Sequence, residues 1–216
     1  MTVRIGHSAV LAAAMLLLAA ALASPRVGAG EALAPADAKR GARIAYTCLG
    51  CHGIADYRNA YPNYHVPKLG GQHAPYLVSA LTEYRTGDRP HKTMHVHAMT
   101  LSDQDLRDIA AYFATDTPVT SSGKPHGMPA VAQVCTSCHG ADGIGITPDY
   151  PTLAGQQPDY LEQALKAYRA GARKNAIMGG FAAALKDDDI HAIAGYFARQ
   201  SPGLKVPARP SSPGSP

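Results

Sequence analysis

Cys48-Leu49-Gly50-Cys51-His52 and Cys135-Thr136-Ser137-Cys138-His139 are two copies of one pattern, C-x-x-C-H. Haem c is attached at this spacing: the two sulfurs form thioethers with the haem, and the histidine ligates the iron. These two motifs contain all four cysteines of the chain. A lone C-x-x-C could also be a zinc or thiol-redox site, but a following histidine, found twice, favours haem. The sequence therefore predicts two covalently bound haem c groups, attached through Cys48, Cys51, Cys135 and Cys138 and ligated by His52 and His139.

The N-terminus of the 216-residue chain has the features of a secretory signal peptide. Arg4 precedes an apolar run from Ala9 to Ala23, and small residues offer cleavage after Ala23 or after Ala29. The run is shorter than the roughly 20 residues that a membrane span needs, although an uncleaved N-terminal anchor is the alternative. Export agrees with haem c, which is attached outside the cytoplasm. We therefore expect residues 1–29 to be a signal peptide and the mature protein to be periplasmic, either soluble or peripherally attached to the membrane.

The charge of the chain argues against one class of partner. Its formal net charge is +4, and removal of residues 1–29 takes away Arg4 and Arg26, which leaves 18 basic against 16 acidic side chains, a net charge of +2. Proteins that bind nucleic acid usually carry a concentrated basic face. The near balance of charge therefore predicts that nucleic acid is not a partner.

The second half of the chain repeats the first, with a constant offset of 84 in residue number. The matching segments are 67–72 with 151–156, 76–77 with 160–161, 84–87 with 168–171, and 109–114 with 193–198. The haem motifs are offset by 87, so the first copy has three extra residues, which belong to the loop 56–66. Two copies with a period this long indicate duplicated domains rather than a solenoid of short repeats.

The repeat and the composition together predict the domain organisation. We expect a first domain at 30–117 and a second domain at 129–200. The segment 118–128 is rich in Pro, Gly and Ser and is predicted to be the linker. The tail at 201–216 is dense in Pro and Ser and is predicted to be disordered.

Hydrophobic periodicity predicts an all-α protein. Helices are expected at 36–47, 75–85, 102–114, 158–169 and 186–198. Gly87 and Gly171 are natural stops just after two of them. No segment shows a convincing alternation of apolar and polar residues that would predict a strand.

The second axial ligand of a six-coordinate haem is usually Met or His. Met178 is the only methionine after Cys138, so it is the candidate for the second haem. The first half offers several candidates, namely His91, Met94, His95, His97 and Met99. Met94 lies seven residues before Leu101, just as Met178 lies seven residues before Leu185. The repeat therefore favours Met94 over Met99, with His95 or His97 as the alternative.

Two prolines are candidates for orienting the haem histidines. A ligating His normally donates its other ring N–H to an oxygen, and a backbone carbonyl can accept it. Pro151 lies 12 residues after His139, and Pro67 lies 15 residues after His52. The three-residue insert accounts for the difference. We expect both proline carbonyls to accept these hydrogen bonds, the alternative being that the prolines only shape a loop.

These residues together resemble the cytochrome c4 family, the tandem two-haem branch of the class I cytochromes c. The resemblance extends from about Ala36 to Arg199 and rests on several shared motifs. They are the two C-x-x-C-H-G sites, the Pro-x-Leu-x-Gly-Gln stretches at 67–72 and 151–156, Met94 and Met178 seven residues before a leucine, and the Tyr-Phe-Ala helix ends. Gly41 fits the small residue at which the first and last helices of such a domain cross. The second domain departs from this pattern, with Met128 at the equivalent position, so its first helix, at 129–134, is expected to be short.

The resemblance implies two tandem class I cytochrome c domains related by pseudo-twofold symmetry. It also implies a periplasmic electron carrier that exchanges single electrons with redox proteins, such as a terminal oxidase or a quinol-oxidising complex. An alternative in the same class is the cytochrome subunit of a dehydrogenase that oxidises a sulfur compound. A dihaem peroxidase is the alternative from another class, and it would need an open or displaceable sixth position on one iron.

Overall fold

The computed structural model describes residues 33–116, 119–121, 123 and 125–208. The predicted signal peptide, residues 1–29, lies outside the described residues. Both haem motifs belong to one compact unit of the chain, which begins at Ala34. None of the described helices has the length and apolar character that crossing a membrane requires.

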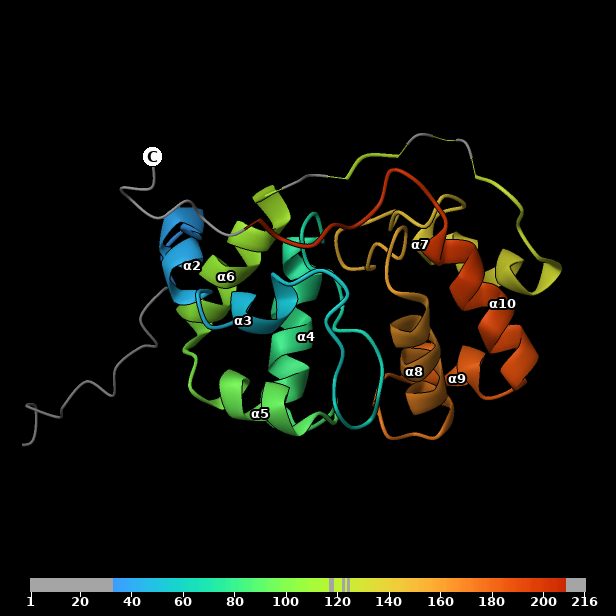
Figure 1. Cartoon of the computed structure of the whole chain (residues 1–216), viewed down its shortest axis with the longest axis horizontal. Coiled ribbons are helices and arrows are strands. Elements are labelled where there is room, and N and C mark those ends of the chain that lie inside the picture. The colour runs from blue at the N-terminus through green and yellow to red at the C-terminus, as the bar shows by residue number, and fades with distance from the viewer. Residues whose placement is uncertain (1–32, 117–118, 122, 124, 209–216) are drawn as a thin grey trace, which may run out of the picture. The chain divides into compact units, whose positions relative to one another are not determined.

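The described part of the chain is helical, as predicted (Figure 1). The first domain contains α2 (Ala38–Ile44), α3 (Leu49–His52), α4 (Ala74–Thr86), α5 (Lys92–Met99) and α6 (Asp103–Asp116). The second contains the 3-10 helix η1 (Ala130–Cys135), α7 (Thr136–His139), α8 (Pro158–Arg169), α9 (Ala176–Ala182) and α10 (Asp187–Ala198). In place of strands, the described residues show isolated antiparallel bridges between Arg58 and His65 and between Gly70 and Lys205.

The core of the first domain depends on a close crossing of α2 and α6. A Cβ atom on Gly41 would lie 1.9 Å from the backbone oxygen of Asp108, so only glycine allows this approach. The buried Asp108 side chain then ties the two helices together, because it accepts from the Asp37 amide at 2.8 Å and from Arg40 Nη1 at 2.5 Å. Around this crossing pack the apolar residues Ala45, Leu49, Leu77, Ile109, Ala110 and Phe113.

The second domain closes its core differently at its N-terminal end. Met128 stands where the first domain has Gly41, and it packs against the core cluster of Ala132, Leu161, Ile193, Ala194, Tyr196 and Phe197. The helix that follows is the six-residue 3-10 helix η1 instead of a full α-helix. A larger side chain at the crossing point replaces the close helix contact, which agrees with the short helix expected there.

Periodicity did not predict the four-residue helices α3 and α7 at the haem motifs, nor α5 and α9. The last two have eight and seven residues, too few to show a clear apolar stripe. Their start is instead defined by N-cap side chains. His91 Nδ1 accepts from the Met94 amide at 3.3 Å, and Asn175 Oδ1 accepts from the Met178 amide at 3.0 Å. Capping therefore explains these helices where hydrophobic patterning does not.

The prediction of a disordered tail from residue 201 is wrong for residues 201–208. Lys205 forms a pair of 3.0 Å backbone hydrogen bonds with Gly70, and the Leu204 amide donates to the Ala154 oxygen at 2.8 Å. Leu204 is buried, and the Tyr112 hydroxyl donates to the Ala208 oxygen at 3.0 Å. A Pro-rich segment cannot form a helix, but its extended backbone can pair with another extended segment. Residues 209–216 lie outside the described part of the chain.

Candidate haem-binding sites

The first C-x-x-C-H motif places its histidine at the wall of an apolar cavity. Cys51 and His52 lie on α3, and Cys48 directly precedes that helix. The buried His52 ring donates from Nδ1 to the carbonyl oxygen of Pro67 at 2.8 Å. Burial lowers the pKa of His52 to about 4, so the ring is neutral at pH 7. With Nδ1 occupied as a donor, the lone pair of Nε2 is available to a metal.

The second motif repeats this geometry. Cys138 and His139 lie on α7, and Cys135 precedes it. The His139 ring is buried and donates from Nδ1 to the carbonyl oxygen of Pro151 at 3.0 Å. Burial again lowers the pKa of this histidine. Both prolines therefore stand in the hydrogen-bonding positions that the sequence predicts for them.

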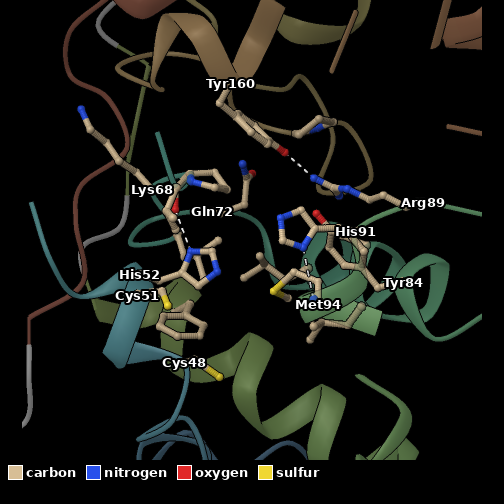
Figure 2. Close-up of a pocket in the computed structure, with 18 of the residues that line it drawn as sticks. Cys48, Cys51, His52, Lys68, Gln72, Tyr84, Arg89, His91, Met94 and Tyr160 are labelled. Atoms are coloured by element: carbon tan, nitrogen blue, oxygen red, sulfur yellow. Dashed lines mark hydrogen bonds between the residues drawn. The ribbon is translucent and has the colours of Figure 1, made fainter. Parts of the chain in front are cut away.

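Met94 and Met178 line the same cavities as these histidines. Figure 2 shows His52 and Met94 on opposite sides of the first cavity. The caps of α5 and α9 set the position of each methionine, because His91 and Asn175, which are equivalent in the repeat, bind the methionine amides. Each cavity thus has an imidazole and a thioether in its wall, the ligand pair of many cytochromes c.

The other candidates of the first domain are placed differently. Met99 is 60% exposed and does not line the cavity. His95 donates from Nδ1 to the Tyr84 carbonyl oxygen at 2.7 Å and is also absent from the lining. His97 does line the cavity, so of the two histidine alternatives it is the one that the fold brings near Met94.

The two cavities are similar in size and largely apolar. They enclose about 1300 and 1230 Å³, including the space at their mouths. Their walls contain aliphatic and aromatic side chains, among them Leu77, Leu81, Ile109 and Phe113 in the first and Leu161, Leu165, Ile193 and Phe197 in the second. Pro151 and Tyr160 line the first cavity as well, and Tyr76 and Glu83 line the second, so each domain contributes to the site of the other.

Two buried arginines at equivalent positions of the repeat form a polar cluster at the interface of the domains. Arg89 lies over the ring of Tyr84 at 4.5 Å, and Arg173 lies over the ring of Tyr168 at 4.4 Å. Both donate to the hydroxyl of Tyr76, at 3.4 and 3.3 Å. Sequence reasoning missed this cluster, although the constant offset of the repeat holds for both arginines and for their tyrosines.

The arginine cluster has an excess of positive charge. Burial alone would raise the pKa of Tyr76, but the guanidinium groups of Arg89 and Arg173 outweigh it and lower that pKa to about 8. Arg173 Nε is buried without a hydrogen-bond partner among the described residues. Buried cations that are not fully compensated favour an anionic ligand. The two carboxylates that every haem carries have this charge, and Arg89 and Arg173 each line one cavity, so the cavities fit haem in their ligands and charge.

Comparison with known proteins identifies the same region of the chain. The family model "Cytochrome c" matches residues 38–116 and 127–200. The chain is 36% identical to cytochrome c4 of Azotobacter vinelandii, over 78% of this chain and 91% of that protein. It is 34% identical to a thiosulfate dehydrogenase electron acceptor of Stutzerimonas stutzeri strain A1501, over 71% of this chain and 79% of that protein. Among solved structures it resembles reduced recombinant cytochrome c4 from Pseudomonas stutzeri, with a TM-score of 0.61 and 32% identity over 79% of this chain and all of that one.

Proposed function

The chain belongs to the cytochrome c4 family and carries two covalently bound haem c groups, and we propose that it is a periplasmic carrier of single electrons between respiratory redox partners. One observation supports this most. Each domain holds a C-x-x-C-H motif, a histidine hydrogen-bonded to a proline carbonyl, and a methionine in the wall of the same cavity.

We assign the roles of the residues as follows. Cys48 and Cys51 attach the first haem, and Cys135 and Cys138 attach the second. His52 and Met94 would hold the iron of the first haem, and His139 and Met178 would hold that of the second. The iron of a bound haem supplies a reversible ferric–ferrous couple.

The chain's own groups adjust that couple. The hydrogen bond from each histidine to its proline carbonyl fixes the ring and raises the basicity of the ligating nitrogen. The apolar walls would limit the access of water and favour ferrous over ferric iron, because the ferrous state has the lower charge. With Met94 and Met178 as iron ligands, neither haem would have an open coordination position, which argues for electron transfer and against a peroxidase.

The partners are proposed from the chemistry and from the relatives. We propose that a terminal oxidase accepts the electrons, in line with the similarity to cytochromes c4. A second candidate partner is a dehydrogenase of sulfur compounds, from which this protein would accept electrons. The similarity to a thiosulfate dehydrogenase electron acceptor favours it. Either partner would be met through a small, transient interface.

Spectroscopy of the purified holoprotein tests the proposal. Low-spin haem with a near-infrared methionine–iron charge-transfer band is expected for both irons of the oxidised protein. A high-spin signal, or rapid cyanide binding without denaturant, would contradict the carrier function. Stopped-flow mixing of the reduced protein with oxidase-containing membranes, and of the oxidised protein with a thiosulfate dehydrogenase, then separates the two partner classes by their rates.

A further inference from the structure

Two buried glutamines make the same contacts in opposite directions between the domains. Gln72, 4% exposed, donates from Nε2 to the Thr152 carbonyl oxygen and accepts from the Thr152 amide at Oε1, both at 2.9 Å. Gln156 makes the same pair of bonds with the backbone of Lys68, at 3.0 and 2.9 Å. The two glutamines are equivalent in the repeat, as are Lys68 and Thr152. The interface is therefore built on a reciprocal pair of side chain–backbone clamps.

Each clamp holds the residue next to a proline that orients a haem histidine. Thr152 directly follows Pro151, whose carbonyl accepts from His139 Nδ1. Lys68 directly follows Pro67, whose carbonyl accepts from His52 Nδ1, and Figure 2 shows Gln72, Lys68 and His52 around the first cavity. A glutamine of one domain thus fixes the backbone that binds the histidine of the other domain.

The amide plane of each glutamine is also fixed within its own domain. Gln72 Oε1 accepts a second hydrogen bond from the amide of His73, the residue before α4, at 3.0 Å. Gln156 Oε1 accepts in the same way from the amide of Gln157, the residue before α8, at 3.0 Å. These buried amides therefore have little freedom to turn, and each links the start of a helix to the proline segment of the other domain.

We propose that Gln72 is a positioning residue for the second haem: by clamping Thr152 it holds the Pro151 carbonyl against His139 and so helps to set that haem's reduction potential. Gln156 does the same for His52 and the first haem. The inference rests on the proposed ligation of the irons by His52 and His139. A strong hydrogen bond at Nδ1 makes the imidazole a better electron donor, which stabilises ferric iron. Loosening the clamp should therefore make the haem easier to reduce.

Gln72 gives the cleaner test of the two. It lines the first cavity but not the second, and its hydrogen bonds to the second domain both go to Thr152. Gln156 lines the first cavity, where its partner haem would be bound, so its substitution could act on that haem directly.

The experiment compares Gln72→Met with wild type in the full-length holoprotein. Methionine keeps the length and flexibility of the side chain but cannot form either hydrogen bond to Thr152. We measure both reduction potentials by redox titration followed by NMR, with the second haem assigned through the resonances lost in Met178→Ala. The expected result is a second haem at least threefold easier to reduce, about 28 mV at 59 mV per tenfold change.

Gln200→Met is the matched control. Gln200 is 3% exposed and clamps the backbone of His126 with the same two kinds of bond, at 3.1 and 3.2 Å. The other hydrogen bond of its side chain goes to the Tyr196 carbonyl oxygen, not to a proline segment. The control variant should leave the second potential unchanged. If Gln72→Met also leaves it unchanged, or if both variants shift it equally, the proposal is overturned.

Two further measurements keep the result interpretable. If Gln72→Met does not retain its haems, Gln72→Asn keeps both polar groups on a shorter arm that cannot reach both Thr152 atoms, and a potential shift of the same sign is expected. A missing shift in that variant overturns the proposal. Wild-type spectra without histidine–methionine ligation would instead overturn the proposed function, which separates the two failures.

Discussion

Glu83 Oε2 lies 3.6 Å from Arg173 Nη2, which pairs a carboxylate of the first domain with a guanidinium of the second. In the repeat, the position equivalent to Glu83 is Ala167. Arg89 therefore lacks the carboxylate partner that Glu83 provides for Arg173. The arginine cluster is therefore symmetric in its cations but not in its anions. Glu83 also lines the second cavity, so this asymmetry acts on one haem more than on the other.

Glu83→Gln should raise the reduction potential of the second haem. Removing a negative charge from the wall of that cavity destabilises ferric iron, and we expect a two- to tenfold change, about 20–60 mV. The two potentials are measured by spectroelectrochemistry. Asp103→Asn is the control, because Asp103 pairs with Arg85 at 2.8 Å at an exposed position and lines neither cavity. A shift in the control of the same size as in Glu83→Gln would contradict a local effect.

Met94→Ala should remove the methionine–iron band of one haem, since Met94 lies in the cavity wall opposite His52. Met99→Ala should leave the band intact, because Met99 is exposed outside that cavity. Near-infrared absorption or magnetic circular dichroism of the oxidised protein reports the band. Loss of ligation in Met99→Ala rather than in Met94→Ala would refute the assignment from the repeat, and an unchanged spectrum in both would favour His97.

The helix crossing of the first domain makes a prediction about stability. Gly41→Ala puts a Cβ atom 1.9 Å from the Asp108 backbone oxygen, where neither partner is a flexible side-chain end. We expect a loss of about 3 kcal/mol or more in the free energy of unfolding. Denaturant titrations of the holoprotein measure it. Gly180→Ala, where an added Cβ would meet nothing within 4 Å, should change stability by less than about 1 kcal/mol.

The sequence predicts the parts of this molecule that repeat along the chain. The offset of 84 gives the two all-α domains, and the structure places Met94 and Met178 in equivalent cavity walls. The long helices α4, α6, α8 and α10 follow from their apolar stripes within one or two residues of the expected ends.

Contacts between distant segments are what the sequence could not provide. Nothing in the local pattern around Gln72 indicates that its amide binds Thr152, because that pairing depends on how the two domains meet. The same holds for Arg58 in the loop 56–66, whose Nη2 lies 3.1 Å from Asp159 Oδ2 on α8. Composition was misleading only at the tail, because a Pro- and Ser-rich segment can still be ordered by pairing with the rest of the fold.

The ordered tail supplies the last prediction. Leu204 is 3% exposed. Its backbone amide binds the Ala154 oxygen, and the next residue, Lys205, pairs with the backbone of Gly70. Leu204→Ala should lower the free energy of unfolding by about 2–3 kcal/mol, the cost of a buried leucine truncated to alanine. Leu33→Ala, the same change at a side chain that is 48% exposed, should cost less than about 0.5 kcal/mol. Equal, small effects in the two variants would mean that residues 201–208 do not contribute to the fold in solution.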